Sequence, residues 1–216
     1  NRAMILKNLF FDLDGTILES SRGILNSFRY TFDEMKYPQL SDTELNTFIG
    51  PPLEVTFETL SKGDDAWAKK AIMTYRQYYA TKGMFDAKPY DGILEMLEDL
   101  HHHNYNLFIA TSKKEDVAQN MLSELNLSHH FKGIFGNTPQ AHSKTLVLKK
   151  SLELTQSTPN TSAMIGDRKY DIIGGQENNV AKTIGVLWGF GDETELKNAG
   201  SNILIAHPQQ LLEIIR

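Results

Sequence analysis

The chain has 216 residues, no cysteine, 22 basic and 27 acidic residues, and a formal net charge of −5. This length suffices for one sizeable core and a small accessory domain. The absence of cysteine excludes disulfides and thiolate metal sites, and an acidic balance without a basic stripe argues against nucleic acid as a partner. The sequence shows neither an apolar run of about 18 residues nor a leader pattern, so we expect no membrane span, no signal peptide and a cytoplasmic protein.

A predicted strand over residues 5 to 11 is followed by two aspartates, a glycine and a threonine: Asp12, Asp14, Gly15 and Thr16. Side chains i and i+2 of an extended chain share a face, so we expect both carboxylates to point into one small volume. At that spacing they repel by about 3 kcal/mol at an effective dielectric constant of 20, so they need a cation or a shared proton. Gly15 allows a sharp turn beside an anion. The pattern is typical of a phosphoryl-transfer site, and a strand end with a turn is the simpler alternative.

Residues 20 to 83 have a helical pattern throughout, without a strand signal. Apolar residues recur at helical spacing in four successive segments, and Ser41 with Glu44 forms a capping box for the second. The fourth segment stops at Gly83. The sequence therefore predicts a four-helix cap domain inserted into a core, with hinges at its two connections. The predicted cap covers residues 19 to 84, the core covers 1 to 18 and 85 to 216, and the hinges lie near 18 to 21 and 83 to 88.

Beyond the predicted cap, helices and strands alternate. This alternation predicts a parallel sheet covered on both faces, and hence an α/β, Rossmann-like core of three layers. The predicted strands lie near residues 105–111, 133–136, 162–166, 181–187 and 202–206. The predicted helices lie near residues 91–102, 115–126, 143–155, 168–178, 192–199 and 208–215.

Three further groups of polar residues end predicted strands or begin predicted helices. Thr111 and Ser112 end one strand, Lys144 begins a helix, and Asp167 ends another strand with Asp171 four residues later. Ligands bind at the carboxyl ends of the strands in an open α/β sheet, so we expect these residues to meet the first pair of aspartates. Taken singly, Lys144 is better explained as a solvated helix residue, and Thr111 with Ser112 as a helix cap.

On these four ordered motifs the sequence resembles the haloacid dehalogenase superfamily of phosphohydrolases, over almost the whole chain. The insert containing Ile-Gly-Pro-Pro at residues 49–52 and the later Gly-Val-Leu-Trp-Gly at 185–189 resemble its phosphoglycolate phosphatase and pyrophosphatase branch. The resemblance implies an Mg²⁺-dependent phosphatase with an aspartyl-phosphate intermediate. Its substrate would be a small phosphorylated metabolite such as phosphoglycolate, a nucleotide or a sugar phosphate.

Each acidic or basic candidate then has a chemical role. Asp12 suits the nucleophile, Asp14 the general acid and base, and Lys144 a cation that offsets charge on the transferring group. The resemblance implies that Mg²⁺ is held by the Asp12 carboxylate, the Asp14 backbone carbonyl and Asp167. Asp171 would sit beside the metal and orient its waters or Lys144. Hard oxygen donors fit magnesium better than zinc.

Candidate phosphate contacts come from the core and from the predicted cap. The core candidates are Gly15, Thr16, Thr111, Ser112 and Lys144, and the cap candidates are Arg22 and Gly50. A surface charge explains Arg22 almost as well, and a plain interhelix turn explains Gly50. Three consecutive histidines at 101–103 point about 100° apart on a helix and cannot share one ion. We interpret Trp188 as a packing residue.

Other functions use the same residues. A pyrophosphatase or a phosphosugar mutase would also need Asp12 and Asp14, whereas a phosphonatase would need a cap lysine for a Schiff base, and no lysine is obviously placed for it. A metabolite-binding regulatory protein is the alternative without catalysis, although such a protein needs no nucleophile and acid together. A small helical lid suits a small substrate, and both a monomer and a homodimer stay open.

Overall fold

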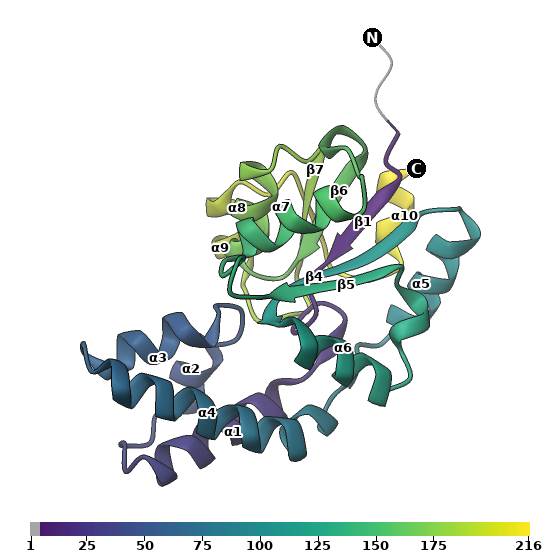
Figure 1. Ribbon diagram of the computed structural model, residues 1–216. Coiled ribbons are helices and arrows are strands. Elements are labelled where there is room, and N and C mark those ends of the chain that lie inside the picture. Colours follow the sequence, from purple (N-terminus) through teal and green to yellow (C-terminus); the bar gives the residue numbers. More distant parts are fainter. Residues whose placement is uncertain (1–4) are drawn as a thin grey trace.

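The computed structural model describes residues 5–216. A six-stranded sheet in the order β5-β4-β1-β6-β7-β8, with every neighbouring pair parallel, forms the centre of the core (Figure 1). The predicted α/β, Rossmann-like fold is therefore confirmed. The strands are β1 Asn8–Phe11, β4 Asn106–Lys114, β5 Gly133–Asn137, β6 Ser162–Gly166, β7 Lys182–Val186 and β8 Ile203–Ile205.

Helices cover both faces of this sheet. On one face, α7 packs against Phe10 and Phe108, with α8 beside it, and on the other face α5, α6 and α10 pack against Leu9 and Phe11. The core helices are α5 Ile93–His102, α6 Glu115–Glu124, α7 Lys144–Leu154, α8 Lys169–Glu177, α9 Glu193–Ala199 and α10 Gln210–Ile215. Short 3₁₀ turns are η1 Gly83–Phe85, η2 Ser128–His130 and η3 Pro159–Thr161. Among residues 5–216, no helix combines the length and apolar character that a membrane crossing needs.

The central strand β1 is buried along its whole length and pairs with β4 on one side and β6 on the other. Phe10 stacks on Phe108 with ring centroids 4.9 Å apart. An apolar strand buried on both faces is what a parallel sheet requires at its centre. The residues that follow β1 therefore emerge at the middle of the carboxyl edge, beside those that follow β4 and β6.

Four helices form a lobe at the carboxyl edge of the sheet, where the arrow of β1 points (Figure 1). An aromatic cluster that includes Phe28, Phe57 and Tyr75 fills its interior, and the Ser41 hydroxyl accepts a hydrogen bond from the Glu44 amide as the predicted capping box requires. The boundaries drawn between cap and core stay a prediction, and residues 1–4 of the predicted core lie outside the described residues. The cap helices are α1 Ser21–Glu34, α2 Asp42–Asn46, α3 Leu53–Ser61 and α4 Asp65–Thr81.

Two local features differ from the sequence expectation. The strands β2 Leu18–Glu19 and β3 Lys88–Pro89 pair antiparallel where the chain enters and leaves the cap. Strands of two residues show no periodicity, so only the pairing of distant segments reveals them. In addition, β4 continues through Thr111 and Ser112, with an irregular register between Ala110 and Lys114. The alternative that these two residues cap a helix is therefore wrong, because α6 begins only at Glu115.

Candidate active site

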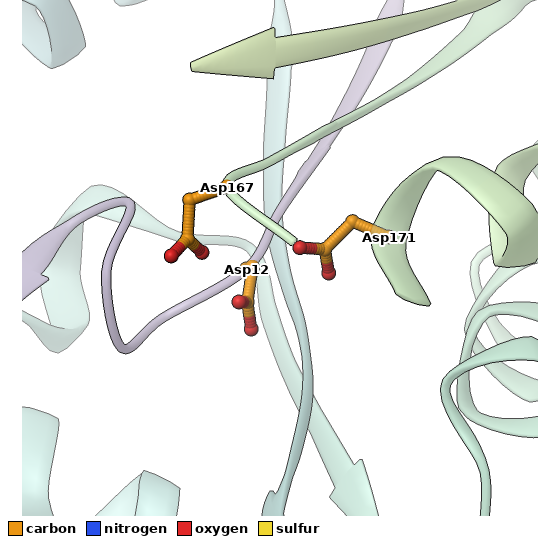
Figure 2. A group of neighbouring side chains, drawn as sticks. All are labelled: Asp12, Asp167 and Asp171. Atoms are coloured by element: carbon orange, nitrogen blue, oxygen red, sulfur yellow. The ribbon is translucent and has the colours of Figure 1, made fainter. Parts of the chain in front are cut away.

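Three aspartates converge at the carboxyl edge of the sheet. Asp12 follows β1, Asp167 follows β6, and Asp171 lies in the first turn of α8. Figure 2 shows their carboxylates directed at one small region, and one oxygen from each lies within 4.8 Å of the others. All three residues are buried. The topology therefore concentrates negative charge where the central strands end.

Burial in this cluster raises the free energy of the charged carboxylates relative to their protonated forms. Burial and repulsion from Asp171, partly opposed by Lys144, raise the pKa of Asp12 from 3.8 to about 6. Burial and the charges of Asp12 and Asp171 also raise the pKa of Asp167 well above its usual range. The Phe190 amide, 2.8 Å from Asp167 Oδ2, offsets only part of that rise. The cluster therefore favours either bound protons or a bound cation.

Lys144 supplies a buried positive charge to the same cluster. Its ammonium donates to Asp12 Oδ1 at 2.8 Å and to the Ala110 carbonyl at 2.9 Å, and it lies 2.9 Å from Asp171 Oδ1. Burial alone disfavours the ammonium, but the two carboxylates outweigh it and raise the pKa of Lys144. With 4% of its side chain exposed, Lys144 is not a solvated helix residue.

Asp14 has different partners from Asp12. Its carboxylate accepts a hydrogen bond from the Ser20 hydroxyl at 2.6 Å and pairs with Lys113 Nζ at 3.1 Å. Strand β1 ends at Phe11, so the i, i+2 rule for extended chains does not carry the Asp14 carboxylate into the three-aspartate cluster. Both aspartates nevertheless line one cavity. The repulsion expected between the Asp12 and Asp14 carboxylates is reduced because Lys113 pairs with Asp14.

This cavity lies between the core and the cap. The core contributes Asp12, Asp14, Ser112 and Lys113, and the cap contributes mainly apolar and aromatic side chains. The Ser112 hydroxyl is buried without a hydrogen-bond partner among the described residues, so an oxygen of a bound ligand could satisfy it. The cap side chains that line the cavity are Ile24, Phe28, Phe48, Ile49, Pro51, Leu53, Tyr75, Arg76 and Tyr79.

Known proteins are similar to this chain in sequence and in fold. The sequence model described as haloacid dehalogenase-like hydrolase matches residues 9–186. The 5'-nucleotidase of Pseudomonas aeruginosa is 33% identical over 198 residues, which cover 90% of this chain and 89% of that protein. The chain belongs to the haloacid dehalogenase-like hydrolase family.

Further relatives agree with this membership. The tyrosine-protein kinase PtkA of Mycobacterium tuberculosis is 31% identical over 208 residues, covering 95% of this chain and 70% of that protein. A solved structure described as a predicted phosphatase from Clostridium acetobutylicum is 36% identical, covers 98% of both chains and superposes with a TM-score of 0.92. The resemblance to haloacid dehalogenase-like hydrolases and the prediction of an enzyme are confirmed.

Two phosphate-contact candidates of this family member lie against Asp167. Gly15 has φ +87°, and a Cβ there would stand 2.2 Å from Asp167 Oδ2, so only glycine fits. The Thr16 hydroxyl donates to Asp167 Oδ1 at 3.1 Å, so its proton orients an acid of the cluster. The Thr111 hydroxyl accepts from the Lys113 amide at 3.1 Å and is buried at the end of β4.

The two cap candidates have different positions. Gly50, with φ +129°, lines the cavity in the connection between α2 and α3. Arg22 does not reach the cavity, because its side chain is 81% exposed at the start of α1 and pairs with Asp86 at 3.2 Å. The structure thus brings every core candidate to the site, whereas of the two cap candidates only Gly50 arrives there.

Sequence reasoning gave Lys113 no role and treated Trp188 only as a packing residue, yet both bind residues of the site. Lys113 binds Asp14 and lies 4.2 Å from the centre of the Tyr79 ring on α4. The Trp188 indole donates to the Thr16 carbonyl at 2.9 Å, so this residue does more than pack. A lysine next to Thr111 and Ser112 was a visible signal, but nothing in the local sequence shows which distant carbonyl an indole N–H meets.

The donor set of the cluster suits a hard cation. Only carboxylate oxygens of Asp12, Asp167 and Asp171 come together there among the described residues, with neither histidine nor cysteine beside them. Burial and repulsion between the carboxylates raise the pKa of Asp12 and of Asp167, and a cation bound there would stabilise both charged forms. Oxygen donors in a buried acidic site fit magnesium or a similar ion.

Proposed function

We propose that this protein is an Mg²⁺-dependent phosphatase that hydrolyses a small phosphorylated metabolite through an aspartyl-phosphate formed on Asp12. The observation that carries the proposal is the meeting of Asp12, Asp167, Asp171 and Lys144 at the carboxyl edge of the sheet, where Asp12 lines the cavity under the cap. A nucleophilic carboxylate beside a cation-binding cluster and a buried ammonium is an arrangement suited to phosphoryl transfer.

The cation would be held by the Asp12 and Asp167 carboxylates and the Asp14 backbone carbonyl, with Asp171 beside it. When bound, Mg²⁺ neutralises charge and polarises the phosphoryl oxygens. Lys144 sits within hydrogen-bond distance of Asp12 and so can offset charge on the group that Asp12 receives. The free Ser112 hydroxyl is placed to donate to a phosphoryl oxygen.

Two displacements complete the proposed reaction. In the first, an Asp12 oxygen forms a bond to phosphorus while the ester P–O bond breaks, and Asp14 gives a proton to the departing oxygen. In the second, water attacks the phosphoryl group, Asp14 takes a proton from that water, and Asp12 leaves as a carboxylate. Lys113 and Ser20 hold the Asp14 carboxyl group at the rim of the cavity between these steps.

The apolar cap lining supports an organic leaving group in place of a second phosphate. Pyrophosphatase and phosphosugar mutase activities, and metabolite binding without turnover, stay as alternatives. The resemblance to the phosphoglycolate phosphatase-like branch guides the choice of substrates for a test.

The experiment is phosphate release from phosphoglycolate, nucleoside monophosphates, sugar phosphates and pyrophosphate, with Mg²⁺ and with a chelator. We expect metal-dependent release that Asp12→Asn abolishes. The control is Asp116→Asn, because this aspartate is 70% exposed and pairs with Lys114 at the surface. Release that survives Asp12→Asn would overturn the proposed nucleophile. An isomerised sugar phosphate without free phosphate would indicate a mutase, and tight binding without product would indicate a regulatory protein.

A further inference from the structure

Arg168 links the acid cluster to the cap. It follows Asp167 directly, and its side chain leaves the core to donate to two main-chain carbonyls in the connection between α2 and α3. One is the carbonyl of Ile49 and the other, at 3.4 Å, that of Thr47. Arg168 as a whole is only 7% exposed. An arginine this buried needs partners for its guanidinium, and the cap carbonyls supply two of them.

The guanidinium is held in place from the core side. Glu195 of α9 accepts from Arg168 Nε at 2.9 Å and from Nη2 at 3.3 Å, and it also accepts from the Lys169 amide at 3.0 Å. The Tyr170 ring lies 5.3 Å from the guanidinium carbon. A paired carboxylate and an aromatic neighbour fix a planar guanidinium in one orientation. The N–H groups of the Arg168 guanidinium are therefore already directed at the cap carbonyls.

The cap side is shaped for the same contact. Gly50 directly follows Ile49 in the connection between α2 and α3. A Cβ at Gly50 would stand 3.0 Å from Arg168 Cγ. Glycine at this point lets the main chain approach the arginine closely. Figure 1 shows the connection between α2 and α3 rising from the cap towards the core.

The contacted segment also forms part of the wall above the active site. Phe48, Ile49, Gly50 and Pro51 line the same cavity as Asp12. The covalent connections between cap and core pass elsewhere, through the paired strands β2 and β3. The Arg168 contacts therefore join this wall to the core at a point away from the paired strands. The Asn137 amide, 3.2 Å from Glu54 Oε2, adds one more hydrogen bond between core and cap.

We propose that Arg168, held by Glu195, is a clasp that keeps the cap closed over the active site. Arg168 is a positioning residue, because its contacts are to the cap main chain and not to the three-aspartate cluster through its side chain. The effect of the clasp on catalysis rests on the proposed phosphatase function. The effect on the cap itself does not.

The test measures the position of the cap directly. The chain contains no cysteine, so cysteines introduced at the exposed positions Lys69 on α4 and Glu177 on α8 accept a pair of fluorophores without further changes. Single-molecule energy transfer then gives the closed-to-open ratio. We expect Arg168→Met to lower this ratio about tenfold or more, since hydrogen bonds from a charged group are lost. We expect a smaller fall for Glu195→Gln, which leaves the arginine in place.

The matched control is Glu193→Gln. Glu193 lies on α9 like Glu195, but it pairs with Lys197 at the surface, at 2.9 Å. This variant should keep the distance distribution of the unchanged protein. A distribution that is the same in the unchanged protein, Arg168→Met and Glu195→Gln would overturn the clasp, as would an unchanged protein that is already open.

Two further readouts separate the clasp from other effects. The Arg168 amide binds Asp171 Oδ2 at 3.0 Å, so Mg²⁺ binding is followed for each variant by thermal shift. Loss of Mg²⁺ binding with an unchanged cap position would place the effect in the acid cluster and refute the clasp. With turnover, a clasp predicts that Arg168→Met raises KM in proportion to the closed fraction that is lost in the distance measurement. An inactive unchanged protein would refute the proposed function and leave the distance test valid. If Arg168→Met does not fold, Glu195→Gln decides alone.

Discussion

Replacing Lys144 by methionine tests the electrostatic account of the acid cluster most directly. Lys144→Met keeps a long, flexible chain but removes the ammonium that lies 2.8 Å from Asp12 and 2.9 Å from Asp171. All three side chains are at most 6% exposed, so water cannot replace the lost charge. The variant therefore leaves two buried carboxylates without their cation.

The size of the effect follows from these distances. At an effective dielectric constant of 20, each ion pair is worth roughly 6 kcal/mol of attraction, most of which offsets the cost of burying the charges. Removing one partner of a buried pair typically destabilises a protein by about 3–5 kcal/mol. The pKa of Asp12 is already about 6 with Lys144 present, and removal of the Lys144 ammonium raises that pKa further. The destabilisation should thus be largest above neutral pH and smaller near pH 5.5, where the acids take up protons.

Urea unfolding in the presence of a chelator, at pH 8 and pH 5.5, measures this loss. The control is Lys150→Met, because Lys150 also lies on α7 but pairs with Glu115 at a more exposed site, 2.9 Å away. We expect the control to lose about 1 kcal/mol or less. Phosphate release by Lys144→Met should fall by at least about 10²-fold, as for the loss of one donor to a transition-state charge. A loss of stability equal to that of the control at both pH values would refute the reasoning.

Three further predictions follow from the same geometry. Asp14→Asn should slow phosphate release from alkyl esters by about 10²–10⁴-fold but slow that from p-nitrophenyl phosphate far less, since this leaving group needs no proton; equal losses would contradict the acid role. Gly15→Ala should weaken Mg²⁺ binding in a thermal-shift titration, because its Cβ meets Asp167, whereas Gly63→Ala, with φ +95° and nothing within 4 Å, should not. Without metal, the raised pKa of Asp12 means that the unfolding free energy falls as pH rises from about 4 to about 6, and Asp12→Asn should flatten the unfolding free energy over that range. Saturating Mg²⁺ should raise Tm and reduce that slope.

The core elements were predictable because each is defined by local pattern. The predicted strand at 162–166 coincides with β6, and the predicted helix at 192–199 differs from α9 by one residue. Buried parallel strands need continuous apolar runs, and amphipathic helices need the 3.6-residue repeat, so both leave a signal in adjacent residues. The strand pair β2 and β3 left none, because two residues cannot show a period.

Local sequence patterns were enough to predict the family, the alternation of strands and helices, and the convergence of Asp12, Lys144, Asp167 and Asp171. These residues meet because each ends a strand or begins a helix at one edge of the sheet. The partners of individual side chains became known only from the three-dimensional fold.

Thr16 binds Asp167, Arg22 binds Asp86, and the Arg168 side chain binds cap carbonyls more than a hundred residues away. Such pairs depend on the relative positions of distant segments and on directions that side chains take in three dimensions. A local pattern carries neither, because hydrogen bonds join atoms that are close in space and need not be close in sequence.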